Sequence, residues 1–325
     1  MKKLGLLLLL AVTAWAQPAN PGPAADAADQ GSGNMPLSTN ASFPVERVQT
    51  PTYADMYCAG FISKDILPDA NFVEGGLHTP NTTKYVNGDI VYLAGGGYHS
   101  GAQYTIVRQL KDPNEYEVFP GQHVAVKAAG QPYSELGRVR IIDTRSKTAI
   151  AQVEFSCDAI TPGDIAIPFA EKPPVAFHSP LRFDRFAPPN GKTSGRIVLG
   201  KDFDSVMGTG MKVYMNVGSN QGVKVGDYFR AVRTYDADLK DPVDSLSFRA
   251  STTEDTQKRP PKVEPSLMNM TYGKGPTIRV RDLPRRAVGE VVVIGVTPTT
   301  ATGMIVFALE DVHVGDGVEL DEQQQ

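Results

Sequence analysis

The chain has 325 residues, of which 41% are hydrophobic, and it carries a formal net charge of −4 at neutral pH. This mildly acidic balance lacks the positive field that phosphate backbones require, which argues against nucleic acid as the main partner. With 31 glycines and 25 prolines, the composition favours a turn-rich globular protein over a helical bundle.

The first residues are organised as an export signal, 1–16. Residues 2–3 are lysines, residues 4–14 form a short apolar core, and residues 14–16 supply an A-x-A cleavage site. The apolar run is about half of the ~20 residues that span a bilayer, so a retained anchor is the weaker alternative. Cleavage near Ala16–Gln17 would remove two lysines and change the net charge from −4 to −6. We expect a mature chain in the periplasm, at the cell surface or secreted, with no transmembrane segment.

Residues 17–52 are rich in Pro, Ala, Asn, Ser and Gly and hold few large apolar side chains. Such a segment cannot bury enough apolar surface to offset the entropy of ordering it, so we interpret it as a disordered leader. Beyond it, short runs that alternate or are β-branched are separated by Gly, Pro, Asn or Asp. That pattern is typical of short strands in a small closed sheet.

An internal duplication is the most informative feature of the chain. Residues 133–169 align without a gap against residues 285–321, at a constant offset of 152. Upstream, Gly60–Ile66 aligns with Ile197–Phe203 at an offset of 137, and later segments align at offsets of 122 and 125. These offsets place about 15 extra residues in copy one near 67–85, and about 27 in copy two. Repetition of this kind indicates two copies of one small module. The identical pairs include Gly137/Gly289, Val139/Val291, Ile142/Ile294, Thr148/Thr300, Ala149/Ala301, Phe155/Phe307, Gly163/Gly315 and Asp164/Asp316.

We therefore expect an all-β protein with two tandem small SH3-like β-barrel modules. The first module is expected over 53–170 and the second over 192–321, which carries a long inserted loop over 234–284. Between them, residues 171–191 form a linker rich in proline and aromatic residues. Because a plain spacer would hold less aromatic surface, we expect this linker to pack on a module.

The sequence has two cysteines, Cys58 and Cys157, and both lie in the exported part. An even count in an oxidising compartment favours a disulfide, and two buried free thiols are the alternative. A bridge that closes a loop of about 100 residues contributes ~4–5 kcal/mol in the chain-entropy view. Copy two has Leu309 at the position of Cys157, so the bridge would belong to copy one alone.

Residues that recur in both copies are interpreted as structural. Asp next to Gly at the same place in each copy suits a turn in which Asp caps backbone amides and Gly takes a positive φ. A glycine inside a strand indicates close backbone approach or an unusual φ. The residues assigned to such roles are Gly137, Gly163, Asp164, Gly289, Gly315 and Asp316.

The sequence offers little that resembles reactive chemistry. Its five histidines lack the H-x-H or H-E-x-x-H spacing of zinc sites, and there is no G-x-S-x-G or Walker sequence. Gly95–Gly97 favours a hairpin turn over a phosphate cradle. The acidic stretch 236–244 lacks the glycine and the twelfth-position glutamate of a calcium loop, which favours a solvated loop. We expect no catalytic, cofactor-binding or metal-binding residues.

A local basic cluster precedes the last strands. We interpret it as a solvated strand edge that discourages edge-to-edge pairing, with contact to an acidic partner as the alternative. Its members are Arg279, Arg281, Arg285 and Arg286.

The turns and strands of copy two also carry a family resemblance. The segments concerned are 213–219 (VYMNVGS), 221–227 (QGVKVGD), 288–291 (VGEV) and 314–316 (VGD). This pattern resembles the C-terminal domain of the flagellar assembly protein T family and similar modules in envelope proteins that carry LysM domains. The resemblance covers roughly 195–320 and, more weakly, 58–169. It implies SH3-like barrels without enzymatic activity, and in flagellar members a ring around the periplasmic collar of the motor.

Taken together, these features predict an exported, non-enzymatic envelope protein that acts as a structural or scaffold component. Its two modules would bind partner proteins in a larger assembly. A module that binds peptidoglycan or another glycan is the first alternative. An unrecognised secreted hydrolase is the second, and it would require a deep cleft with converging ionisable groups.

Overall fold

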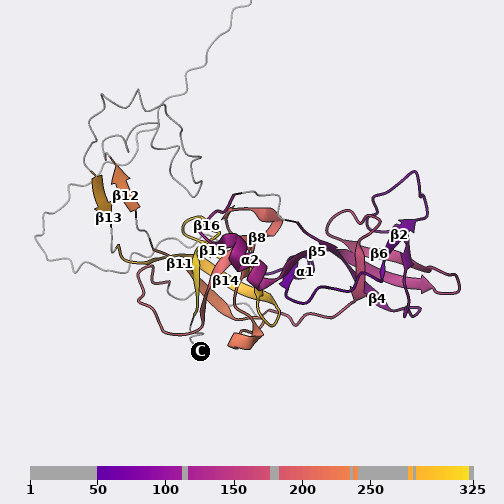
Figure 1. Cartoon of the computed structure of the whole chain (residues 1–325). Coiled ribbons are helices and arrows are strands. Elements are labelled where there is room, and N and C mark those ends of the chain that lie inside the picture. The colour runs from indigo at the N-terminus through magenta and orange to yellow at the C-terminus, as the bar shows by residue number, and fades with distance from the viewer. Residues whose placement is uncertain are drawn as a thin grey trace, which may run out of the picture. The chain divides into compact units, whose positions relative to one another are not determined.

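A computed structural model describes residues 50–111, 116–175, 183–234, 237–240, 277–280 and 283–321 (Figure 1). All of them belong to one compact unit, Phe43–Gln325. The predicted signal 1–16, most of the predicted leader and most of the expected inserted loop lie outside the described residues.

The first half of the chain forms a closed barrel. Strands β5, β4, β7, β2, β3 and β6 follow one another around it, the β5–β6 pairing closes the ring, and β1 adds to the outside of β5. Its elements are α1 (Tyr53–Tyr57), β1 (Phe61–Ser63), β2 (Phe72–Gly76), β3 (Ile90–Ala94), β4 (Gln103–Gln109), α2 (Gln122–Ala129), β5 (Gln131–Asp143), β6 (Ala149–Ser156) and β7 (Ile165–Pro168).

The second half forms a barrel of the same order, β14, β11, β17, β8, β10 and β15. Each strand thus has a counterpart in the first barrel, and the all-β fold with two tandem duplicated barrels is confirmed. Its elements are β8 (Ser194–Gly200), η1 (Lys201–Phe203), β9 (Val206–Met207), β10 (Lys212–Met215), η2 (Ser219–Gln221), β11 (Tyr228–Arg233), β12 (Ala237–Lys240), β13 (Thr277–Val280), β14 (Arg286–Val296), β15 (Ala301–Ala308), β16 (Val312–His313) and β17 (Gly317–Leu320).

We call the β2–β7 barrel module 1 and the β8–β17 barrel module 2. The centre of each ring is filled by aliphatic and aromatic side chains. The centre of module 1 includes Val73, Val91, Leu93, Ile106, Val139, Ile141 and Val153. The centre of module 2 includes Ile197, Val213, Met215, Phe229, Val291, Val293 and Ile305.

The start of copy one differs from the sequence alignment. The counterpart of β8 is β2, because β2 pairs with β3 and β7 as β8 pairs with β10 and β17. Val73 lies opposite Leu93 and Ile197 lies opposite Met215, next to a register shift in each module. The alignment of Gly60–Ile66 with Ile197–Phe203 is therefore wrong. The extra residues of copy one precede β2 and include β1, which has no counterpart in the second ring.

The two modules differ in how their strands are buried. In β5 from Gly137 onward, and in β6 as far as Glu154, buried residues alternate with more exposed ones, as expected for a sheet with one solvated face. In β14 and β15 nearly every residue is buried, so both faces of these strands are covered. Module 2 is the enclosed barrel, and segments from the first half of the chain cover it.

Candidate functional site

The segment that precedes module 1, residues 52–63, is the candidate site, and we call it the arm. It begins with α1, whose start is held by a capping box between Thr52 and Asp55. Asp55 also pairs with Lys212 of module 2. Burial acts to raise the pKa of Asp55, but hydrogen bonds from Lys212 and Thr52 outweigh it and lower that pKa. This ion pair thus ties α1, the first described helix, to module 2.

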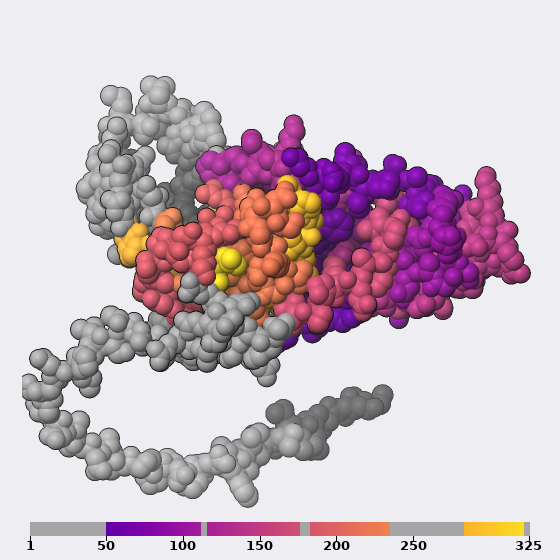
Figure 2. Space-filling model, turned by 90° about the horizontal axis from the view of Figure 1, so that it is seen from below, coloured from indigo at the N-terminus to yellow at the C-terminus, as the bar shows by residue number. Residues whose placement is uncertain are grey.

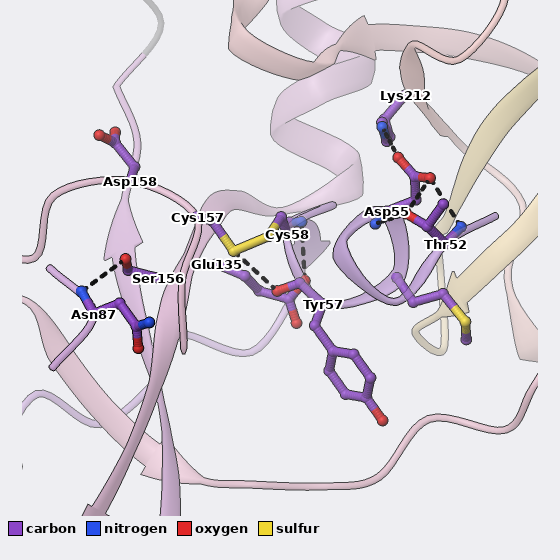
Figure 3. Close-up of a disulfide and its surroundings, with 12 residues drawn as sticks. Thr52, Asp55, Tyr57, Cys58, Asn87, Glu135, Ser156, Cys157, Asp158 and Lys212 are labelled. Atoms are coloured by element: carbon purple, nitrogen blue, oxygen red, sulfur yellow. Dashed lines mark hydrogen bonds and ion pairs between the residues drawn. A yellow bond between two sulfur atoms is a disulfide. The ribbon is translucent and has the colours of Figure 1, made fainter. Parts of the chain in front are cut away.

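A disulfide fixes the arm to module 1. Cys58 and Cys157 are bonded with their Cα atoms 5.6 Å apart, across a sequence separation of 99, so the predicted pairing is confirmed (Figure 3). Figure 3 shows the bridge beside Tyr57 and Glu135, with the Asp55–Lys212 pair on the other side of α1. The covalent bond therefore lies within a few residues of the contact with module 2.

Beyond Cys58 the arm is extended, and three hydroxyls of module 2 bind its backbone. The Tyr214 hydroxyl donates to the carbonyl of residue 59 at 2.8 Å. Thr302 donates to the carbonyl of residue 60 at 3.0 Å, and Thr300 to that of residue 62 at 2.7 Å. All three bonds are buried. We call Tyr214, Thr300 and Thr302 the hydroxyl triad. In Figure 2, indigo residues from the beginning of the described chain lie against a gold segment of module 2.

The other edge of the arm pairs with module 1. Phe61 lies opposite Tyr133 in an antiparallel register between β1 and β5. A strand with an unpaired edge attracts other strands, and a buried carbonyl without a donor is costly. The hydroxyl triad supplies the donors on the side that β5 leaves open. The arm consequently lies between the two modules and bonds to both along its two edges, so it forms a wall that they share.

Gly60 is required at the centre of this wall. Its φ is +74°, and a Cβ placed there would lie 2.6 Å from the Tyr133 carbonyl oxygen and 2.7 Å from the Tyr214 hydroxyl. Its amide donates to the buried carboxylate of Glu135 at 3.1 Å, and Lys172 of the linker binds the same carboxylate at 2.8 Å. The charge of Glu135 is therefore paired inside the junction.

The loop between β4 and β5 covers a second part of module 2. Phe119 lies against Gly315, where an added Cβ would be 3.0 Å from its ring, and the Arg196 guanidinium lies over that ring at 5.0 Å. In α2, Gln122 donates to the carbonyl of Val198 at 3.2 Å. Ile62 packs in a buried cluster with Ala129 of α2 and residues of β8 and β10.

The described end of the linker, residues 183–190, also packs on module 2, and we call it the strap. Phe183 meets Phe307 edge-on, with ring centroids 4.8 Å apart. The amide of Ala287 donates to the carbonyl of Arg185 at 2.7 Å, and that of Asn190 to Glu319 at 2.7 Å. The expectation that the linker packs on a module is confirmed for these residues; 176–182 lie outside the described ones.

The turn residues expected from the duplication lie before the last strand of each barrel. Gly163 and Gly315 have φ values of +94° and +105°. Asp164 accepts a hydrogen bond from the amide of residue 161 at 2.6 Å, and Asp316 from that of residue 313 at 2.7 Å. The structure adds an arginine to each turn. These arginines lie at aligned positions of the strands GAQYTIVR and GDYFRAVR, a signal that was present in the sequence.

Both arginines bind their aspartate with two parallel bonds. Arg108 contacts Asp164 at 2.8 Å through Nε and 2.8 Å through Nη2. Arg233 contacts Asp316 at 2.8 Å and 2.7 Å in the same way. Paired and duplicated, these carboxylates hold the last strand of each barrel in place. This geometry agrees with the structural role expected of both aspartates.

Gly137 and Gly289 occupy equivalent places of close backbone approach. A Cβ on Gly137 would lie 2.3 Å from the Phe155 carbonyl oxygen, and one on Gly289 would lie 2.6 Å from that of Phe307. Neither has a positive φ, so steric contact is the reason for glycine here.

The basic cluster is not a free surface where it can be described. Arg285 pairs with Glu319 at 2.6 Å and Arg286 with Glu310 at 3.0 Å, and both arginines are half-buried. The interpretation as a solvated strand edge is wrong for these two residues. Arg279 is described only as part of β13, and Arg281 lies outside the described residues.

Glu290, in the VGEV segment, is a buried acid for which the sequence predicted no separate role. It is 2% exposed, and its Oε2 has no hydrogen-bond partner in the described structure. Burial, followed by the charge of Asp321, raises its pKa from 4.5 to about 7, although Arg230 acts to lower it. In the sequence, Glu290 could have been noticed as the only charged residue within the apolar run 287–296 of β14.

Metal binding and membrane spanning can be assessed only within the described residues. No group of three or more His, Cys, Asp or Glu within the described ranges could hold a metal ion. No helix among those residues is long and apolar enough to cross a bilayer. Most of the acidic stretch 236–244, and His178, lie outside them.

Comparison with known proteins adds no relative. No protein-family model matches the chain. No curated protein matches it either. The resemblance to the flagellar assembly protein T family stays a prediction.

Proposed function

We propose that this protein is an exported, non-enzymatic component of the cell envelope that holds partner proteins through its tandem β modules. The observation that carries the proposal is the unequal covering of two equivalent barrels. Module 2 has Val292, Met304 and Val306, all buried, on the outer face of β14 and β15. At the aligned positions module 1 has Arg140, Gln152 and Glu154, which are exposed or half-exposed.

This difference supports separate roles for the two modules. The outer face of module 2 is used within the chain, where the arm and the strap cover it. The outer face of module 1 is polar, and its Arg140 and Gln152 are exposed in the part of the chain that the structure describes. Module 2, whose outer face is covered by other parts of the chain, therefore serves as the support. Module 1, which is fixed to it, presents the binding surfaces.

The junction also suits a scaffold because it limits relative motion. The arm is held by a disulfide, by pairing with β5 and by three buried bonds from the hydroxyl triad. A disulfide that closes a long loop and several buried hydrogen bonds together contribute several kcal/mol, on the order of 5 to 8. Surfaces on the two modules would keep a fixed spacing in an assembly.

The test is chemical cross-linking of the full-length oxidised protein in its own envelope fraction, followed by affinity capture. We expect one or a few proteins to be recovered in fixed proportion to the bait. Sedimentation with purified sacculi instead of protein recovery would favour the glycan-binding alternative. Turnover of envelope polymers by the purified protein would favour the hydrolase.

A further inference from the structure

Module 1 contains a second, incomplete copy of the hydroxyl triad. Tyr92 on β3 lies opposite Ile150 on β6, as Tyr214 on β10 lies opposite Thr302 on β15. Thr148 and Thr300 are an identical pair of the ungapped duplication. Two of the three hydroxyls that bind the arm on module 2 therefore recur on module 1, at the same place in the barrel.

The two copies differ in occupancy. On module 2, Tyr214 is 2% exposed, and burial raises its pKa above the ordinary range. On module 1, Tyr92, Thr148 and Ile150 are all half-exposed. Within the described residues, neither the Tyr92 hydroxyl nor the Thr148 hydroxyl makes a hydrogen bond. Among the described residues, this face therefore has a bound segment on module 2 and none on module 1.

The occupied copy defines what the face accepts. It binds carbonyls of an extended backbone, which selects conformation rather than sequence. It also places the Tyr214 hydroxyl 2.7 Å from where a Cβ on residue 60 would lie, which selects glycine at that position. Because Tyr92 is the counterpart of Tyr214, a side chain at the equivalent position would meet the Tyr92 hydroxyl, and this contact favours glycine on module 1 as well.

One end of the face differs in charge. On module 2, Val198 is buried in the cluster that holds Ile62. Glu74 takes the place of Val198 on module 1, beside the equivalent register shift, and it is exposed. An aliphatic side chain such as Ile62 gains little there, whereas a lysine or arginine gains a partner of opposite charge.

We propose that the face formed by Tyr92, Thr148 and Glu74 on module 1 is a docking site for an extended segment of a partner protein. The segment carries glycine where the arm has Gly60, and a basic residue where the arm has Ile62. This site rests on the proposed scaffold function and names the class of partner. The hydroxyls of Tyr92 and Thr148 bind the main chain of the segment. The Tyr92 hydroxyl favours glycine at one position, and Glu74 favours a positive charge at another.

The test uses the full-length oxidised protein and labelled peptides whose sequence follows that of the arm. The probe is Ser-Ala-Gly-Phe-Arg-Ser-Lys, compared with the same peptide carrying Glu in place of Arg, and with one carrying Ala in place of Gly. Fluorescence anisotropy should show saturable binding of the first peptide and weaker binding of the other two. Tyr92→Phe and Thr148→Val should each weaken binding about fivefold, the usual effect of one hydrogen bond. Glu74→Lys should reverse the preference between Arg and Glu.

A matched control is Tyr116→Phe, which alters a tyrosine that is 79% exposed elsewhere in the first half of the chain. It should leave binding unchanged. Circular dichroism of each variant establishes that the barrels are folded. Absence of saturable binding to folded wild-type protein, or equal binding by all variants, would overturn the site.

The same variants separate this inference from the proposed function. If cross-linking recovers a partner equally from wild type and from Tyr92→Phe/Thr148→Val, the docking site is wrong and the scaffold function stands. If the peptide binds as expected but no protein is recovered from the envelope, the site stands as a peptide receptor and the scaffold function fails.

Discussion

Replacing Glu290 by glutamine should stabilise the protein at alkaline pH and leave it unchanged at acid pH. The carboxyl is 2% exposed, and its Oε2 lacks a hydrogen bond within the described structure. Burial, with the charge of Asp321, raises its pKa from 4.5 to about 7, against the opposing effect of Arg230. The folded state therefore disfavours the ionised form.

The sign and size follow from proton linkage. Below pH 4.5 the carboxyl is protonated in both states, so it carries no penalty. Between pH 4.5 and 7 the unfolded chain ionises first, and the free energy of unfolding falls. Above pH 7 the full cost is present, about 3 kcal/mol for a pKa that rises from 4.5 to about 7, at ~1.36 kcal/mol for each pH unit between them. Glutamine has nearly the same shape and does not ionise, so the variant escapes this cost.

Urea unfolding followed by far-UV circular dichroism at pH 4.5, 6 and 8 measures the effect. The variant should exceed wild type by about 2–3 kcal/mol at pH 8, with the difference vanishing at pH 4.5. Glu171→Gln, at an exposed glutamate, is the matched control and should show no such trend. A Glu290→Gln difference that is constant across pH would refute the reasoning, because it would not come from ionisation.

Three further changes test the junction and the duplicated framework. Replacing Cys58 and Cys157 by serine should lower the free energy of unfolding by about 4–5 kcal/mol in urea titrations, given the loop that the bridge closes, and an unchanged midpoint would contradict this. Gly289→Val should lower the melting temperature because the added Cβ would meet the backbone, whereas Gly96→Ala, with open space around it, should not. Equal melting temperatures for the two variants would count against close backbone approach at Gly289. Thr302→Val should cost about 1–3 kcal/mol by leaving the carbonyl of residue 60 without a donor, and wild-type stability would show that this bond is dispensable.

The duplicated alignment predicted the barrels but not the way they are joined. Strand periodicity and the offset of 152 are local features. The offset aligns β5 with β14 and β6 with β15, and these strands occupy equivalent places in the two rings. The arm resembles a first strand of copy one in sequence, because a short apolar run followed by Lys-Asp looks the same in either role. Only pairing with partners far along the chain distinguishes β1 from β2.

The enclosed module could have been identified from the alignment itself. Outward positions that are polar in one copy and apolar in the other mark the face that is buried, as Arg140 against Val292 and Glu154 against Val306 do. The uninterrupted apolar run of β14 carries the same information, since strands covered on both faces lose their alternation. The hydroxyl triad could not have been found this way, because its donors act on a distant segment, 238 residues away for Thr300 and 242 for Thr302.

Residue-resolved hydrogen exchange of the oxidised full-length protein tests the central claim most directly. If the arm is a wall shared by both barrels, amides of residues 60–63 should exchange as slowly as those of β5 and β15, and Thr302→Val should accelerate them without affecting β3. Exchange of these amides at the rate of an unstructured peptide, with both barrels still protected, would mean that the modules are not joined in this way.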